Sequence, residues 1–464
     1  MTLSFSTKPF ELSRRKALVL SSSALAAAAF LGVISTLSTQ PANRQLNEDY
    51  NILDEDQTLP PIFPFRWQDY LGFGCAILGL LLAAGGGIGG GGILVPVYIL
   101  LLEFPVKHAI PLASVTVLGG AIANNALNIR KVNPNHAERP AIDWDLILLL
   151  EPATIAGALI GAELNEVLPE IVLLVLMLLL LTVTAYKTLG KACNMYSDEN
   201  EIAEASRQLE NSFAHYDLRE DVENYGETIM EEGHKNEIDG IEATNRQNSS
   251  FNESERMAIK RQCINAAIEL ISLFSIVTIL DILQDSLISC GAHCYLVSQA
   301  LIFLCIVLFS LYFRHSILQR QNELGGPIIS DIHWDNSNTL IYPSLSIIAG
   351  LVAGMFGIGG GIIKGPLLLQ LGVHPQVASA TSACMILFTS STSTICFLIS
   401  GYLVYDYAAF CLVLGFLATL VGQTAMSALL ESSGKRSSYI AFSIGGVVAI
   451  SAVAMGIEST IAIF

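Results

Sequence analysis

Apolar residues occur along most of this chain in long runs rather than at the two-residue or three-to-four-residue spacing of soluble elements. Runs of about 17–25 apolar residues are long enough to cross the hydrocarbon core of a bilayer as a helix. The pattern predicts such helices near 110–128, 145–165, 169–189, 263–284, 295–313, 378–400, 403–428 and 438–460. The sequence therefore predicts an all-α integral membrane protein with a polytopic helical bundle.

Two further apolar runs, 69–103 and 341–372, are too long for a single crossing. As one straight helix, Leu71–Leu102 would measure about 48 Å, against a hydrocarbon core of about 30 Å. Each run contains a glycine tract, GGGIGGGG at 85–92 and GIGGG at 357–361. Glycine is a poor helix former, so each run is expected to bend there and leave the membrane on the side from which it entered.

The two glycine tracts belong to an internal repeat. Gly87–Ser114 aligns without gaps with Gly357–Cys384 at an offset of 270 residues, and the proline after each tract also matches. After a slip of nine residues a second stretch aligns, Trp144–Gly161 with Tyr405–Gly422. Chance similarity between low-complexity stretches would account for the glycines but poorly for the ordered prolines and the aromatic-Asp start. Internal repeats of this kind are typical of secondary transporters.

The distribution of positive charge predicts the topology, because Lys and Arg concentrate on the cytoplasmic side of membrane proteins. With two hairpins and a cytoplasmic N-terminus, 20 of the 24 Lys and Arg residues fall inside. The exceptions are Arg44, Arg66 and Lys107 outside and Lys364 within the membrane. An odd number of crossings then separates the hairpins. The predicted architecture is two inverted repeats, each opening with a glycine-broken helical hairpin, with both bends near the midplane.

The remaining segments complete the expected organisation. Arg14, Arg15 and Lys16 precede a run of small and apolar residues, so residues 1–40 are either a signal peptide or a retained signal anchor. The other expected units are an extracytoplasmic segment at 41–68, repeat one at 69–192, an acidic cytoplasmic insert at 193–262, two linking transmembrane helices at 263–313, a cytoplasmic loop at 314–340 and repeat two at 341–464.

The net charge of −17 is concentrated in the insert, because residues 197–256 hold 17 Asp and Glu against 5 Lys and Arg. Few apolar residues and no clear periodicity favour a solvated, disordered or loosely helical linker. The alternative is an acidic docking or regulatory loop. The sign of the charge argues against nucleic-acid binding.

The glycine bends are the candidate binding site. A short helix is expected to begin after each tract, and a helix N-terminus offers unpaired N–H groups and a partial positive charge that bind small oxyanions. The alternative is that the glycines only allow helices to pack closely. The candidate substrate-binding residues in the two tracts are Gly89, Gly90, Gly91 and Pro96, and Gly359, Gly360, Gly361, Lys364 and Pro366.

Side chains near the bends could complete this site. The candidates are Ser114, Thr116 and Asn124 after the first tract, and Thr381 and Ser382 among the hydroxyls after the second, which also include Ser379 and Thr389. Such groups more often bond their own helix backbone. Glu151 is a candidate carrier of a coupling proton, and Lys364 could attract an anion, because ionisable groups at membrane depth are usually functional. The alternatives are a packing hydrogen bond for Glu151 and snorkelling for Lys364.

Several stretches resemble the sulfite exporter TauE/SafE family, in particular its longer eukaryotic members. They are the paired glycine tracts with their prolines, LGVHPQVASATSA at 371–383 and AIDWDLILLLEPATIAGALIGAELNEVLPE at 141–170, and the likeness covers roughly 66–192 and 340–457. The resemblance implies secondary transport, as an exporter, of small sulfur-containing anions such as sulfite or organosulfonates. Lys364 departs from the family pattern, which is usually apolar there.

Other classes of protein are disfavoured. The nine cysteines form no enzyme or metal pattern, and Cys290 and Cys294 are a candidate disulfide in an outside loop. No P-loop ending occurs, which argues against an ATP-driven pump, and no cofactor is expected. A non-transporting scaffold or receptor that acts through its acidic insert is the alternative function. The expected location is a multi-pass position in the endomembrane system or the plasma membrane, and the oligomeric state is open.

The predicted topology can be tested by glycosylation. The sequons at Asn248 and Asn252 lie in the insert, and a cytoplasmic insert does not meet the glycosylation machinery. Protein purified from a eukaryotic host should therefore carry no glycan on either residue. Glycosidase-sensitive mass on a peptide containing Asn248 or Asn252 would contradict the topology.

Overall fold

The computed structural model describes residues 65–84, 89–134, 139–217, 253–287, 292–324, 334 and 337–432, with further positions between 438 and 456. The predicted signal segment at 1–40, both sequons and the Cys290–Cys294 disulfide fall outside the described residues and side chains and stay predictions. Over its described part the chain is helical, apart from loops and one isolated bridge between Val132 and Pro140. The prediction of an all-α fold is confirmed.

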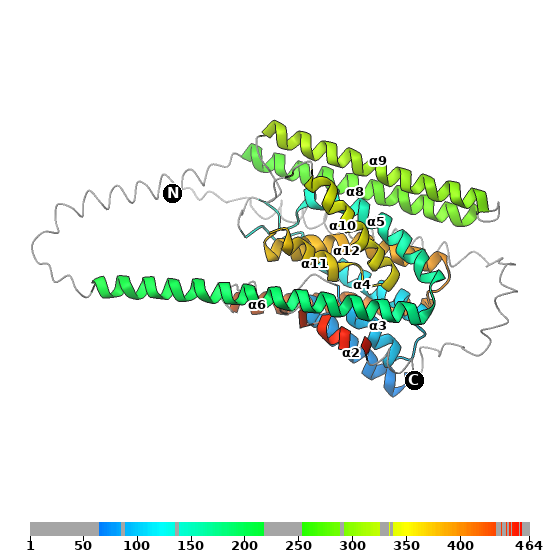
Figure 1. Ribbon diagram of the computed structural model, residues 1–464, viewed down its shortest axis with the longest axis horizontal. Helices are drawn as coiled ribbons and strands as arrows, with labels where there is room; N and C mark the ends of the chain where they lie inside the picture. Colours follow the sequence, from blue (N-terminus) through cyan, green and yellow to red (C-terminus); the bar gives the residue numbers. More distant parts are fainter. Residues whose placement is uncertain are drawn as a thin grey trace, which may run out of the picture.

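In the described part, nine helices are long and apolar enough to cross a membrane. They are α2 (Trp67–Ala84), α4 (Val106–Asn128), α5 (Trp144–Val167), α6 (Glu170–Asp217), α8 (Glu253–Leu287), α9 (Ala292–Leu324), α10 (Asn338–Phe356), α12 (Pro375–Ile399) and α13 (Tyr405–Ser432). Two helices of 10 residues, α3 (Gly91–Leu100) and α11 (Gly361–Gln370), lie among them (Figure 1). The protein is a multi-pass membrane protein.

The first long apolar run is a hairpin, as predicted. Gly72 near the start of α2 lies against Leu102 beyond the end of α3, whereas Gly79 farther along α2 lies against Ile93 near the start of α3. The two helices therefore run antiparallel. A helix of 10 residues, the length of α3, rises about 15 Å, which is half of a core of about 30 Å. The bend before α3 consequently lies near half depth.

The internal repeat reappears in the helices. Both α3 and α11 have 10 residues, and the residues that precede them, Gly90 and Gly360, have left-handed φ angles of 72° and 73°. Only glycine adopts this conformation without strain, which explains its placement there. The later pair also matches, since α5 begins at Trp144 and α13 at Tyr405, the two positions aligned in the sequence.

The two repeats run in opposite directions. Val117 of α4 and Ile386 of α12 flank the same glycine. Farther along α4, the Asn125 side chain donates to the carbonyl of Ala383, which precedes Ile386 in α12, at 3.0 Å. Going from the first contact to the second, the residue number rises from 117 to 125 in α4 and falls from 386 to 383 in α12. These equivalent helices are therefore antiparallel. The prediction of inverted repeats is confirmed.

The repeats are interlocked through close backbone contacts. Helix α5 of repeat one packs along α10 and α12 of repeat two, and α13 packs along α2 and α4. Between α5 and α10, a Cβ added to any of four glycines would come within 2.0–2.2 Å of a carbonyl oxygen of the other helix: Gly157, Gly161, Gly350 and Gly354. Lipid is as apolar as the side chains, so the hydrophobic effect does not drive helices together in a membrane. Small residues at a crossing let the backbones approach closely enough for van der Waals and weak polar contacts to hold the helices together.

Helix α6 extends beyond the bundle, and the linking helices α8 and α9 follow it in the chain. Helix α6 has 48 residues, about 72 Å at the α-helical rise, and Figure 1 shows it continuing well past its neighbours. The acidic insert therefore starts as a continuation of α6, to Asp217, and returns as the start of α8 at Glu253. Helices α8 and α9 pack together along one edge of the bundle. The described positions between 438 and 456 are helical, and Gly445 lies against Leu189 of α6.

The helix crossing predicts opposite effects of two glycine replacements. Gly354→Ala should destabilise the protein by about 1–3 kcal/mol through overpacking, because the new methyl would lie 2.1 Å from the carbonyl oxygen of Ala158. Gly190→Ala in α6, where nothing lies within 4 Å, should stabilise it by up to about 1 kcal/mol through helix propensity. Thermal unfolding in detergent measures both, and equal shifts would contradict the crossing.

Candidate functional site

The two glycine bends meet at the centre of the bundle. A Cβ added to Gly91 would lie 2.5 Å from the Cα of Ile358, so the start of α3 touches the second bend. A Cβ on Gly89 or on Gly359 would meet the same two side chains, Val117 of α4 and Ile386 of α12. The bends predicted from two distant tracts therefore pack around one pair of residues.

Each bend presents the N-terminus of a short helix. Gly90 and Gly360 precede α3 and α11, and neither helix has a hydrogen bond from a capping side chain. The first N–H groups of a helix have no partner within it, and the aligned peptide dipoles give this end about half a positive charge. Because the repeats are inverted, the two positive ends approach one centre from opposite sides.

Proline follows at the sixth position of both short helices, as Pro96 and Pro366. A proline inside a helix lacks the N–H that would bond the carbonyl four residues earlier. In these helices the carbonyls concerned are those of Gly92 and Ile362. The two prolines thus loosen the first turns of α3 and α11 and do not themselves lie at the bends.

A buried ion pair lies beside the second bend. The Lys364 ammonium of α11 is 3.1 Å from Oε2 and 3.5 Å from Oε1 of Glu151 in α5. Lys364 is 1% exposed and Glu151 is 0% exposed. The ammonium does not snorkel to the membrane surface, and each of the two residues predicted as separate candidates is the other's partner.

Thr389 of α12 links this pair to the bend. The Lys364 ammonium donates to the Thr389 hydroxyl at 3.0 Å. The same hydroxyl lies 3.0 Å from the carbonyl of Gly359 and 2.9 Å from that of Met385, either of which can accept its proton. A continuous series of polar contacts therefore runs from Glu151 through Lys364 and Thr389 to the glycine bend.

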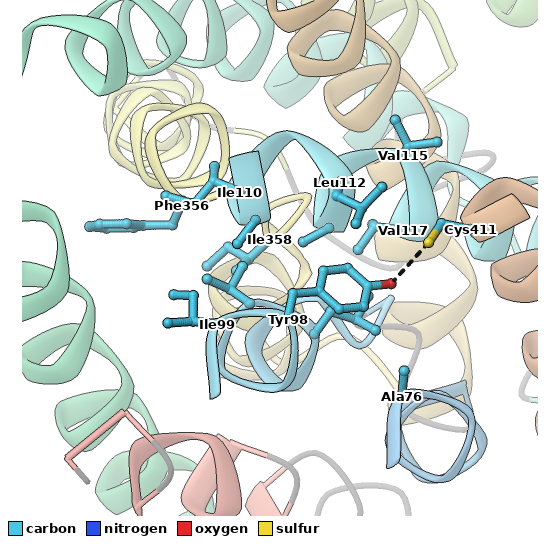
Figure 2. Packing of buried hydrophobic residues seen from close by; sticks show 14 of the residues in the cluster. Ala76, Tyr98, Ile99, Ile110, Leu112, Val115, Val117, Phe356, Ile358 and Cys411 are labelled. Atoms are coloured by element: carbon cyan, nitrogen blue, oxygen red, sulfur yellow. Dashed lines mark hydrogen bonds between the residues drawn. The ribbon is translucent and has the colours of Figure 1, made fainter. Parts of the chain in front are cut away.

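The first half of the site holds a neutral polar group instead. The Tyr98 hydroxyl of α3 lies 2.8 Å from Oγ1 of Thr116 and 3.7 Å from Sγ of Cys411. Figure 2 shows the Tyr98 ring between α4 and α3 with its hydroxyl directed at Cys411. Thr116 also donates to the carbonyl of Leu112, at 2.8 Å. Thr116, a predicted binding residue, thus bonds its own helix and Tyr98.

Ser114 has the free hydroxyl of the group. Its Oγ is buried and has no hydrogen-bond partner among the described residues. An added Cβ on Gly357 would lie 2.9 Å from that oxygen, so Ser114 faces the second bend from α4. A buried hydroxyl without a partner costs free energy, and at this place it can serve a ligand.

Thr381 and Ser382, two predicted binding residues, form hydrogen bonds with backbone groups of α12 and of the residue before α5, and their role in binding stays a prediction. Thr381 accepts a bond from the backbone N–H of Asp143 at 3.0 Å, and Ser382 donates to the carbonyl of Ser379 at 3.3 Å. Both precede Thr389 by seven or eight residues, about 10–12 Å along the axis of α12. The sequence analysis favoured them over Thr389 because they lie in a motif of the family. In the structure Thr381 bonds the residue before α5, and Ser382 bonds the backbone of α12.

Asn124 belongs to a separate amide cluster near the end of α2. With the Gln423 amide oriented to pair both of its atoms, that side chain donates to Asn124 at 3.0 Å and to the carbonyl of Ala84 at 2.6 Å, and accepts from Lys131 at 2.8 Å. Burial lowers the pKa of Lys131, which lies in the loop after α4. Asn124 is seven residues, about 10 Å, beyond Val117 along α4.

Tyr98 and Cys411 were not predicted as parts of the site, and Thr389, named among the candidate hydroxyls, was not one of the preferred residues. A signal for the ion pair was present, because Glu151 and Lys364 are lone opposite charges in apolar helices. The described residues contain no group of three or more His, Cys, Asp or Glu that could hold a metal ion. The arrangement can bind a small anion and hold a proton.

Comparisons with known proteins agree with these features. The family described as "Sulfite exporter TauE/SafE" matches residues 71–213 and 293–461. The chain is similar to "Sulfite exporter TauE/SafE family protein 3" of Arabidopsis thaliana, 29% identical over 398 residues, which are 85% of this chain and 79% of that protein. It is also similar to family protein 5 of Arabidopsis thaliana, 29% identical over 384 residues, covering 82% and 80%.

A shorter match reaches a bacterial protein. "Probable membrane transporter protein YunE" of Bacillus subtilis is 36% identical over 66 residues, 14% of this chain and 24% of that protein. No solved structure matches the chain significantly.

Proposed function

The chain belongs to the sulfite exporter TauE/SafE family and is a membrane transporter, and we propose that it carries small sulfur-containing anions such as sulfite or organosulfonates as a secondary transporter, working as an exporter. The observation that carries this proposal is the meeting of two glycine bends, each at the N-terminus of a short helix, at the centre of inverted repeats.

Electrostatics support an anionic substrate. Two helix N-termini contribute about half a positive charge each. Beside them the Lys364 ammonium is balanced by the Glu151 carboxylate. The centre is therefore positive by about one charge, which suits a monoanion such as hydrogen sulfite or a sulfonate. The oxygens of such an anion can accept several backbone N–H bonds at once, as phosphates do at helix N-termini.

Inverted repeats support transport as the activity. In such proteins the substrate lies where the repeats meet, and one repeat or one bundle of helices moves against the other to expose the substrate to each side in turn. The alternative function, a scaffold or receptor acting through the acidic insert, makes a different demand. Deleting residues 218–252, between α6 and α8, should leave anion flux intact in a transporter and abolish the function of a scaffold.

The glycine bends are tested by replacing Gly90 and Gly360 with valine. Both have left-handed φ angles, and a β-branched side chain is strained there and blocks the approach of an anion to the backbone. Sulfite flux in proteoliposomes should fall at least about tenfold in each variant, a loss of about 1.4 kcal/mol of transition-state stabilisation. Gly74→Val is the matched control, because Gly74 lies on α2 with nothing within 4 Å, and it should transport normally.

Protein recovery and helical content are measured beside flux, so that a folding defect is seen as such. Wild-type flux and anion affinity in well-folded Gly90→Val and Gly360→Val would leave the glycines as packing residues and contradict the proposed site.

Ser114→Ala tests the unpaired hydroxyl. Removing a buried group that has no partner should leave thermal stability unchanged or raise it, since Oγ makes no bond in the described structure. Anion affinity should fall about tenfold, because a hydrogen bond to a charged ligand contributes about 1.5 kcal/mol. A loss of stability with unchanged affinity would show that the hydroxyl serves the fold and not the ligand.

A further inference from the structure

The Glu151–Lys364 pair is an unusual feature for the centre of a membrane protein. Both side chains are fully buried, and the ammonium lies 3.1 Å from the carboxylate. Burying two charges costs desolvation energy that a well-packed apolar pair would not incur. In addition, Lys364 lies in the first turns of α11, where the helix dipole disfavours a cation. Stability alone therefore gives little reason for these residues.

The equivalent place on the other side of the bundle, where α3, α4 and α13 meet, has no such pair. The repeat alignment gives each of the three residues an equivalent in the other repeat: Leu94 of repeat one for Lys364, Gly119 of repeat one for Thr389, and Leu412 of repeat two for Glu151. Gly119 lies directly against the backbone of Leu412, so the equivalent helices pack closely without any charge. The polar set has been placed in one half of the protein only, beside its glycine bend.

We propose that the Glu151 carboxylate and the substrate compete for the Lys364 ammonium. In the empty protein the carboxylate is paired with the ammonium, and an incoming anion displaces the carboxylate and binds the ammonium in its place. Released from its cation in a dry site, the carboxylate takes up a proton and becomes neutral. Anion and proton are then bound together and are released together. The inference rests on the proposed function and adds its coupling ion and the residues that carry it.

The balance of charge and protons is simple. The empty site holds one carboxylate and one ammonium. The loaded site holds one monoanion, the ammonium and a carboxylic acid, so one proton enters with one anion and the total charge is unchanged. Such a site moves an anion without moving net charge, which spares the cost of carrying an uncompensated charge through the membrane. Thr389 and the Gly359 carbonyl beyond it keep the ammonium in place during the exchange.

Several other charged groups near the pair have partners of their own. The titratable side chain of α12 that faces both members of the pair is Cys384. Helix α10, which packs along α5, contains no Asp, Glu, Lys, Arg or His. Charged groups on the other neighbouring helices have contacts farther away: Lys191 of α6 with the carbonyl of Leu369, Arg320 of α9 with Asp145, and Asp281 of α8 with the thiol of Cys396.

The test is the linkage between anion binding and proton uptake in the purified full-length protein. Methanesulfonate is the probe, because it stays ionised throughout the working range, so any proton taken up belongs to the protein. Calorimetric titrations between about pH 6 and pH 8, in two buffers of different ionisation enthalpy, give both affinity and protons bound. The wild type should take up close to one proton per anion and bind up to about tenfold more weakly for each unit of rising pH.

Two variants separate the exchange from a structural role. Glu151→Gln keeps a hydrogen bond to Lys364 but cannot compete as a charge, so it should bind the probe more tightly, with no proton uptake and no pH dependence. The double variant Glu151→Leu/Lys364→Leu copies the equivalent residues, Leu412 and Leu94. It should fold as stably as the wild type and bind the probe at least about tenfold more weakly at every pH, since an ammonium–anion bond is lost.

Each outcome has a distinct meaning. Wild-type pH dependence and proton uptake in Glu151→Gln would overturn the exchange while leaving anion transport in place. Normal, proton-coupled binding in the double leucine variant would likewise show that the pair has no part in binding. No binding of methanesulfonate or sulfite to well-folded wild-type protein would instead overturn the proposed function, and this inference with it.

Discussion

Lipid offers no hydrogen bonds to the backbone, and this constraint organises the whole structure. A helix broken at half depth is tolerated only where other protein surrounds the break or where the break lines a cavity. This chain breaks two helices at glycine tracts, and the inverted repeats bring both breaks together in the interior, with the start of α3 touching Ile358. Each repeat thus shields the irregular backbone of the other from lipid.

The same arrangement supplies the chemistry of the site. Two short helices of 10 residues direct their N-termini at one centre, which provides donors and positive potential without requiring a charged side chain. The Glu151–Lys364 pair is then an addition to one half, not a part of the common scaffold. Its position next to Thr389 and the second bend ties it to the binding centre.

Close packing of glycines keeps the two halves in register. Helix α5 approaches α10 until carbonyl oxygens lie where a Cβ would be, and α4 and α13 are similarly close at Gly119 and Gly415. These contacts join elements of different repeats. A movement that exposes the centre to one side must therefore carry α5 with α10 and α13 with α4 as rigid pairs, with the bends as the points of change.

The repeats, the hairpins and the inverted topology could be predicted from the sequence, because run length, glycine position and charge asymmetry follow directly from the thickness and polarity of a bilayer. The pairing of Glu151 with Lys364 could not be predicted, because the two residues are 213 positions apart and lie in different repeats. It depends on α5 packing against the opposite repeat. Thr381 was preferred to Thr389 because it lies in a motif of the family. The hydrogen-bond partners of the two residues depend instead on their positions along α12, since Thr381 lies beside Asp143 and Thr389 beside Lys364.

The sequence left the start of the insert open between disorder and a loose helix, because the apolar pattern ends near residue 189, and in the structure α6 continues to Asp217. Beyond that point good helix formers such as Glu and Ala favour the helix, and contacts such as Tyr196 with Phe442 and Glu199 with Ser438 hold the first turns of this extension against the bundle. Hydrophobic runs mark where a helix meets lipid, not where it stops.

If both bends hold one anion, anomalous diffraction from a brominated substrate analogue will locate it between them. Crystals of the wild-type protein grown with bromomethanesulfonate should show one bromine peak in the interior, with sulfonate oxygens within about 3.2 Å of backbone N–H groups of both α3 and α11. A peak bound to one bend alone, or a sulfonate found only at the surface while the interior stays without density for it, would contradict the account.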